Sequence, residues 1–143
     1  MPHYTGTVTT RRPIDEVFDY LADFSSVAEW DPSIPRARRL DSGGVEKGSR
    51  FEVIFRVLAR EQRLVYRVLE IDRPRYVRLR AETDGVTSTD TIELESIPGG
   101  GTRITYDADL GLAGALRLAE LPMRLFFRWI GDRGRRGLEE ALA

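Results

Sequence analysis

Six short segments of alternating apolar and polar residues follow one another between Arg36 and Leu110, and this succession limits the fold more than any other feature of the chain. The segments are rich in β-branched and aromatic residues, which predicts strands with one buried face. They cover residues 36–40, 49–58, 61–71, 76–83, 88–97 and 102–110. Because little more than turn signals such as Gly43-Gly44 and Asp84-Gly85 separates them, we expect consecutive strands to be antiparallel neighbours.

A first strand and two short helices precede this meander. Residues 3–10 alternate and are predicted to form a strand, and an apolar face at helical spacing follows within residues 11–24. Pro13 suits a first helical position, and Asp23 is suited to cap a second short helix from Phe24 to about Glu29. The two prolines at positions 32 and 35 prevent that helix from continuing.

The chain ends in a long predicted helix, from Leu112 to about Leu142, which Pro122 should kink or divide. Its main apolar stripe consists of Leu112, Leu116, Ala119, Met123, Phe126 and Ile130. A second apolar stripe flanks the first and consists of Leu118, Leu121, Leu125 and Trp129. A surface this broad has two interpretations: a deeply packed core helix, or a helix that lines a ligand cavity.

The alternation of each strand predicts which side chains face the helix. The inward residues are Phe51, Val53, Phe55, Leu79, Ile92 and Tyr106, together with Tyr66 in a fourth strand whose register is ambiguous and whose pattern suggests a bulge. Parity with Ile92 and Leu94 also places Asp90 and Ser88 on the inner face. A carboxylate there needs a hydrogen-bond partner or a solvated cavity. The alternative is that the strand begins later and Asp90 lies at its wet rim.

Composition excludes several classes of function. A length of 143 residues suits one domain over residues 1–143. The formal net charge of -1 argues against general nucleic-acid binding, which usually requires a basic excess. There is no cysteine, and His3 is the only histidine, so thiol chemistry, a Ser-His-Asp triad and a histidine-based metal site are not expected. We therefore expect no metal and no cofactor. No apolar run reaches membrane-spanning length, and the expected compartment is the cytoplasm.

Surface arginines are candidates for a second kind of site. The outward-facing arginines of the strands are suited either to bind RNA or a protein partner or to pair across strands with nearby glutamates; they are Arg56, Arg63, Arg67, Arg78 and Arg80. Several arginines of the last helix form a basic edge, which suits either anionic lipid or plain solvation. Solvated pairing is the expectation in both cases.

Four stretches carry a resemblance to a known family: PIDEVFDYLADFSSVAEWDPSI, KGSRFEV, VLEIDRPRYVRL and GGGTRITYDADL. With them the whole chain resembles the START-like/Bet v 1-like (SRPBCC) superfamily, and within it the bacterial polyketide cyclase/dehydrase subgroup. The resemblance implies an α+β helix-grip fold, in which a curved antiparallel sheet of about seven strands surrounds a long C-terminal helix. Two short helices would follow strand 1. Trp30 would lie at the mouth or wall of a cavity, as a packing plug or a ligand contact, and Asp31 would bond nearby backbone N–H groups.

The resemblance implies binding of a small hydrophobic molecule, such as a lipid, an isoprenoid or a polyketide-like compound, between sheet and helix. The expected ligand-binding residues are Trp30, Phe51, Val53, Phe55, Tyr66, Leu79, Asp90, Ile92, Tyr106, Met123, Phe126 and Ile130. The alternative is a cyclase or dehydratase, in which Asp90 and a tyrosine, Tyr66 or Tyr106, form an acid–base pair. We expect a monomer or homodimer without stable membrane insertion.

Overall fold

A seven-stranded antiparallel sheet forms the body of the protein, with strand order β1-β7-β6-β5-β4-β3-β2. The computed structural model describes residues 2–57, 59–83, 85–114, 118 and 120–143. The strands are β1 (His3–Thr10), β2 (Arg36–Arg39), β3 (Arg50–Val57), β4 (Arg60–Asp72), β5 (Tyr76–Thr83), β6 (Val86–Ser96) and β7 (Thr102–Leu112). The helices are α1 (Ile14–Ala22), η1 (Phe24–Ser26), α2 (Val27–Trp30) and α3 (Glu120–Ala141). This arrangement confirms the predicted helix-grip fold.

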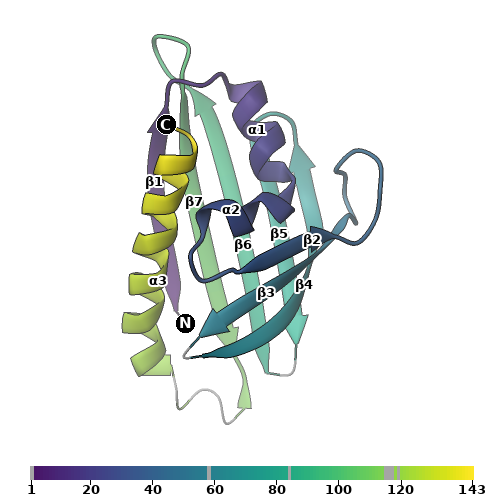
Figure 1. Cartoon of the computed structure of the whole chain (residues 1–143), viewed down its shortest axis with the longest axis vertical. Helices are drawn as coiled ribbons and strands as arrows, with labels where there is room; N and C mark the ends of the chain where they lie inside the picture. The colour runs from purple at the N-terminus through teal and green to yellow at the C-terminus, as the bar shows by residue number, and fades with distance from the viewer. Residues whose placement is uncertain (1, 58, 84, 115–117, 119) are drawn as a thin grey trace.

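All helices lie on one face of the curved sheet (Figure 1). The short elements α1, η1 and α2 cover its central and β2-side strands, and α3 runs along the edge strand β1. Local chemistry accounts for the first helices. Pro13 is the residue before α1, whose buried side is formed by Val17, Phe18 and Leu21. Asp23 caps η1 as predicted, because its Oδ1 accepts a hydrogen bond from the Ser25 backbone N–H at 3.2 Å.

Strand β4 contains the predicted irregularity. Its register with β5 shifts between Val68 and Glu70, which indicates a β-bulge. Tyr66 and Val68 are buried on the inner face, as predicted, and Glu70 is exposed. The bulge therefore allows a strand that is apolar on both faces to keep its inner side chains in the core.

The last helix differs from the prediction at its start. β7 continues through Leu112, and α3 begins at Glu120. Pro122 consequently lies in the first turn of α3, where its missing N–H has no intrahelical partner to lose, so it does not divide the helix. Two predicted stripe residues, Leu116 and Ala119, lie outside the described residues.

Three residues of the predicted second apolar stripe are neither core nor cavity wall, and the side chain of the fourth, Leu121, lies outside the described part of the chain. Leu118, Leu125 and Trp129 are 89%, 71% and 52% exposed. The reason is the position of α3 over β1, an edge strand, which leaves the far side of the helix without a layer to pack against among the described residues. None of the described helices combines the length and the apolar character that a membrane crossing requires.

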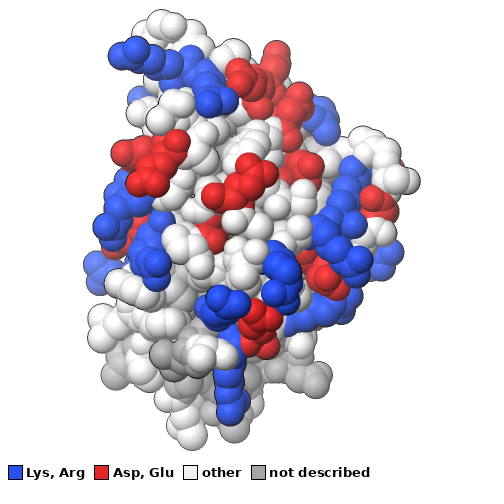
Figure 2. Space-filling view, in the orientation of Figure 1, with Lys and Arg blue, Asp and Glu red and all other residues white. Residues whose placement is uncertain are grey.

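The outer face of the sheet bears ion pairs. Glu52 of β3 accepts hydrogen bonds from Arg38 of β2 and Arg63 of β4, and Glu61 pairs with Arg36 and Arg56. Figure 2 views the opposite, helix-covered side of the molecule and shows basic and acidic side chains interspersed there as well. These contacts agree with the predicted cross-strand pairing of the strand arginines.

Candidate ligand cavity

A cavity of about 310 Å³ lies between α3 and the inner face of the sheet. It is close to the lower limit of typical ligand sites. Apolar side chains form most of its wall: Val8, Phe24, Val27, Trp30, Ile34, Val53, Phe55, Leu64, Val86, Ile104, Ala108, Leu110, Leu112, Met123, Phe127, Ile130 and Leu138. Its polar side chains are Tyr4, Asp31, Gln62, Tyr66, Ser88, Asp90, Tyr106 and Arg135. The structure thus contains the cavity that the broad apolar surface of the helix suggested.

Eight residues predicted to contact a ligand line this cavity: Trp30, Val53, Phe55, Tyr66, Asp90, Tyr106, Met123 and Ile130. They come from α2, from four strands and from α3, so the fold brings together positions up to a hundred residues apart in the chain. Their facing is what alternation and helical spacing predicted. Their ligand-binding role stays a prediction.

Three predicted contacts, Phe51, Leu79 and Ile92, do not line the cavity, and that part of the prediction is wrong. Each faces inward but is fully buried in the core. The ring of Phe24 in η1 packs edge-on against Phe51 at a centroid distance of 6.3 Å, and α1 contacts β6, the strand that contains Ile92. Alternation predicted the face of these side chains, but in the structure they pack in one core cluster with Phe18 of α1 and Phe24 of η1.

Phe126 is also wrong as a cavity residue. Its ring stacks on Trp129 at 5.8 Å, and the neighbouring Phe127 lines the cavity instead. The stripe that faces the sheet is Met123, Phe127, Ile130, Gly134 and Leu138. Both stripes have helical spacing through adjacent phenylalanines, so the sequence pattern alone did not distinguish them.

Glycines on α3 allow the rim of the cavity to close. A Cβ at Gly137 would overlap the backbone carbonyl of Trp30, and one at Gly131 would overlap the ring of Tyr4. Gly131 and Gly137 lie six residues apart in the sequence, with Gly134 midway between them. In the structure the two outer glycines permit close packing, because α3 approaches α2 at Gly137 and β1 at Gly131.

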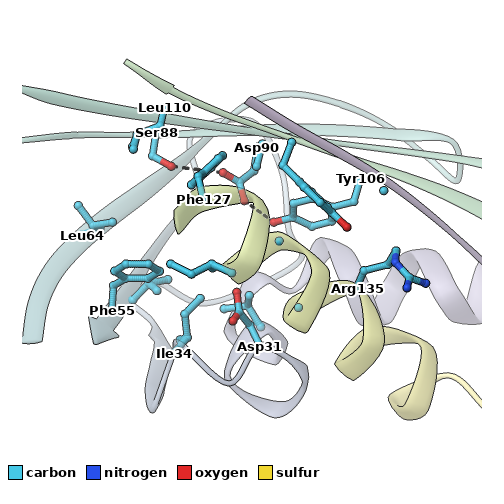
Figure 3. A pocket seen from close by; sticks show the side chains of 18 of the residues that line it. Asp31, Ile34, Phe55, Leu64, Ser88, Asp90, Tyr106, Leu110, Phe127 and Arg135 are labelled. Atoms are coloured by element: carbon cyan, nitrogen blue, oxygen red, sulfur yellow. Dashed lines mark hydrogen bonds between the residues drawn. The ribbon is translucent and has the colours of Figure 1, made fainter. Parts of the chain in front are cut away.

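The Asp90 cluster, which we define as Asp90, Tyr106, Ser88 and Tyr66, is the main polar group on the sheet side of the cavity (Figure 3). The Tyr106 hydroxyl donates a hydrogen bond to Asp90 Oδ2, and Ser88 Oγ lies 3.5 Å from Oδ1. Ser88 and Tyr66 share a hydrogen bond of 2.9 Å. Asp90 is only 8% exposed, so the prediction of a buried carboxyl group bonded to a tyrosine is confirmed.

Burial dominates the acid–base properties of this cluster. It raises the pKa of Asp90 to about 7, although the Tyr106 hydrogen bond acts in the opposite direction. Burial also raises the pKa of Tyr66 and of Tyr106, and the nearby Asp90 charge adds to both increases. Near pH 7, Asp90 therefore interconverts between carboxylic acid and carboxylate, while both tyrosines keep their protons.

Asp31 is a cavity residue whose facing the sequence did not reveal. It follows α2 in the turn toward β2, and its Oδ1 accepts hydrogen bonds from the backbone N–H and the hydroxyl of Ser33, at 2.9 and 2.6 Å. These contacts confirm the predicted bonding of Asp31 within its own turn. Burial raises its pKa, and the Ser33 hydrogen bonds partly offset that increase. Its residue type signalled a turn, but only the packing of that turn against α3 places the carboxyl group on the cavity.

Trp30 forms part of the wall beside Tyr106. It is 6% exposed, and the two rings meet edge-to-face with centroids 5.5 Å apart. Its Nε1 has no hydrogen-bond partner among the described residues. This placement agrees with the predicted packing role of Trp30 at the wall. The other lining residues missed by the sequence prediction include Tyr4 and Arg135, whose long side chains reach the cavity from β1 and α3.

The cavity offers an apolar volume with two buried carboxyl groups, Asp31 and Asp90, and its described wall residues include no histidine or lysine. Across the described parts of the chain, no three potential metal-ligating side chains gather in one place. Such a site is suited to enclose an apolar molecule and to bond a few polar atoms of it. It is also suited to move one proton to or from an enclosed molecule.

Comparison with known proteins agrees with this geometry. A family model described as "Polyketide cyclase / dehydrase and lipid transport" matches residues 1–143. No curated protein matches the chain in sequence.

Solved structures share the fold at low sequence identity. The Zhui aromatase/cyclase from Streptomyces sp. R1128 is 19% identical, with a TM-score of 0.75, covering 98% of this chain and 90% of that one. A START superfamily protein from Mycobacterium smegmatis is 12% identical, with a TM-score of 0.72 and coverage of 98% and 96%. The major latex-like protein 151 from Panax ginseng is 11% identical, with a TM-score of 0.71 and coverage of 99% and 97%. At these identities the likeness concerns the fold alone.

Proposed function

Since the chain belongs to the polyketide cyclase/dehydrase and lipid transport family, we propose that it binds a small hydrophobic molecule in the cavity between α3 and the sheet. The observation that carries the proposal is the cavity itself, about 310 Å³ in volume and lined mostly by apolar side chains. Burying the apolar surface of a ligand against such a wall stabilises the complex by about 25 cal/mol for each Å² removed from water. A lipid, an isoprenoid or a polyketide-like compound has this character.

Native mass spectrometry of the protein purified from its own source tests the proposal. We expect a bound small molecule that is released by organic solvent and is absent from a Met123→Arg variant purified in the same way. Met123 lines the cavity, and a charged side chain there would place a cation on an apolar wall. A protein that carries no small molecule and also binds no neutral naphthalene dye would contradict the proposal.

The Asp90 cluster favours a second candidate, a cyclase or dehydratase. Asp90 as carboxylate is suited to remove the acidic proton between two carbonyl groups of an enclosed poly-β-carbonyl chain. The resulting enolate carbon would add to a distant carbonyl group of the same chain, with the proton delivered to the new alkoxide. Loss of water would follow, and no redox partner is needed. The pKa of Asp90, about 7, suits a group that both takes and returns a proton.

Asp90→Asn distinguishes the two candidates. In a cyclase, the substitution should lower turnover far more than affinity, because an amide cannot accept the proton. In a carrier, it should change affinity or selectivity for the polar end of the ligand, and no turnover of a poly-β-carbonyl substrate should be measurable in the unaltered protein. Location in the cytoplasm, independence of nucleic acid and a monomeric or dimeric state stay predictions.

A further inference from the structure

Two carboxyl groups face the cavity from opposite walls. Asp90 extends from β6 on the sheet side, and Asp31 extends from the turn after α2 (Figure 3). They are close enough for the charge of Asp31 to add to the rise in the pKa of Asp90. Two carboxylates inside one apolar enclosure repel each other and lack the water that would normally solvate them.

The described residues of the cavity wall offer these carboxyl groups no opposing cation. Arg135 is the one basic residue on that wall, and its guanidinium donates to Glu139 at 3.2 Å, outside the cavity. Figure 3 shows it directed away from both carboxyl groups. Arg133 also acts on Asp31 through space, but its guanidinium lies over the Trp129 ring, 4.7 Å from the centroid.

The hydrogen bonds that the carboxyl groups do receive come from neutral donors. Asp90 accepts hydrogen bonds from the hydroxyl groups of Tyr106 and, at 3.5 Å, of Ser88. Asp31 accepts both hydrogen bonds from Ser33 at Oδ1, and its Oδ2 has no hydrogen-bond partner among the described residues. Neutral donors stabilise a carboxylate without cancelling its charge. The described residues of the wall therefore leave the negative charge of the two carboxylates unbalanced.

We propose, on the basis of the proposed hydrophobic-ligand function, that this cavity selects an apolar molecule that carries a protonated amine, held between Asp31 and Asp90. The ammonium group supplies the cation that the wall lacks, and its N–H groups reach acceptor atoms that neutral donors leave underused. The apolar body occupies the region formed by residues such as Leu110, Met123 and Phe127. By the same reasoning, a ligand that ends in a carboxylate is rejected.

Three probes with one ring system test this selection: 1-naphthylmethylamine, 1-naphthalenemethanol and 1-naphthoate. They present a cation, a neutral group and an anion on the same apolar body. In calorimetric titrations at pH 8, we expect the amine to bind about tenfold more tightly than the alcohol, and the carboxylate about tenfold more weakly. The pH lies above the pKa of Asp90, which is about 7, so that its carboxyl group is ionised.

Charge-neutralising variants identify the residues responsible. Asp90→Asn and Asp31→Asn should each reduce the preference for amine over alcohol several-fold while leaving the affinity for the alcohol within about twofold. Asn at position 31 keeps the acceptor oxygen for Ser33, so that variant also guards against a failure of Asp90→Asn to fold. Glu140→Gln removes the same charge from an exposed site on α3 and should leave the preference unchanged.

Each outcome decides the question. If the alcohol binds but the amine is not preferred, or if both Asn variants keep the preference, the inference is wrong although the proposed function stands. Equal binding of the carboxylate and the amine overturns it as well. If none of the three probes binds, the proposed hydrophobic-ligand function fails, and this inference fails with it.

Discussion

Two neighbouring parts of the same inner sheet face differ in how they are filled. In the core cluster that includes side chains of α1 and η1, the side chains of Phe51, Leu79 and Ile92 are completely buried. Beneath α3, residues of the same strands, such as Val53 and Asp90, line a cavity instead. Strand alternation is the same in both parts, so the difference comes from the helices that cover them.

The covering helices approach the sheet in different ways. α1 and η1 bury large apolar side chains, including Phe18 and Phe24, in the core. α3 contacts β1 at Gly131 and α2 at Gly137. Its inward side chains Met123 and Phe127 line the cavity above the sheet instead of filling it. Alternation therefore determines which way a side chain points, and the covering element determines whether it meets another side chain or a void.

Truncating one leucine in each part should reveal the largest difference between them, in the free energy of unfolding that each variant loses. Leu79→Ala should cost about 2–5 kcal/mol of unfolding free energy, because it opens a void in a close-packed core. Leu110→Ala should cost less than about 1.5 kcal/mol, because its side chain already borders the cavity. Urea unfolding of both variants measures the difference. Equal losses would mean that the part beneath α3 is packed as densely as the part beneath α1.

The hollow part also contains the titrating group, and its effect on stability depends on pH. Asp90 has a pKa of about 7 when folded, against an ordinary value of 3.8. Its contribution to stability is therefore full below the ordinary value and is lost as the pH rises through about 7. Asp90→Asn does not titrate, so relative to the unaltered protein it should gain on the order of 3 kcal/mol in unfolding free energy between pH 4 and pH 8.

Denaturant unfolding at several pH values checks this expectation. Asp41→Asn serves as the control: a hydrogen bond from Arg39 lowers the pKa of that exposed carboxyl group, so this variant should show no gain between pH 4 and pH 8. A constant difference between Asp90→Asn and the unaltered protein from pH 4 to pH 8 would show that burial does not raise the pKa of Asp90.

A charge on the cavity side of α3 should matter far more for binding than the same charge on its outer side. Met123→Arg should weaken binding of N-phenyl-1-naphthylamine at least about a hundredfold, because the substitution places a cation on an apolar wall. Leu125→Arg is the matched control, because Leu125 is 71% exposed, and it should retain affinity within about twofold. Similar losses in both, measured by dye fluorescence, would invalidate the assigned faces of α3.

The smallest expected effect concerns the rim where α3 meets β1. The Tyr4 hydroxyl donates a hydrogen bond of 2.9 Å to Asp132. Because this bond is exposed, Tyr4→Phe should cost less than about 1 kcal/mol of unfolding free energy and should leave dye affinity nearly unchanged. A loss as large as that of Leu79→Ala would show that this hydrogen bond, and not apolar packing, holds α3 in place. Thermal unfolding of the variant provides the measurement.

The sequence predicted the strands, the two short helices and the inner face of the sheet, because each depends on local periodicity. It also predicted Asp90, because one carboxylate in register with Ile92 and Leu94 breaks an otherwise apolar face. It did not predict that Leu79 and Ile92 are covered, since this depends on how α1 docks on the sheet. It predicted Phe126 in place of Phe127 as a cavity residue, because both phenylalanines fit the helical spacing of Met123 and Ile130. Asp31 lies in a turn, where no periodicity indicates the direction of a side chain.

Intermolecular nuclear Overhauser effects with bound 1-naphthalenemethanol test the central claim most directly, because they report which side chains touch a neutral ligand. With the methyl groups of the protein labelled, we predict contacts from the ligand to Leu110, Met123 and Ile130, which line the cavity. We predict none to Leu79, Val77 and Ile92, which lie in the filled core. Contacts to the second group, or binding without contacts to the first, would contradict the account.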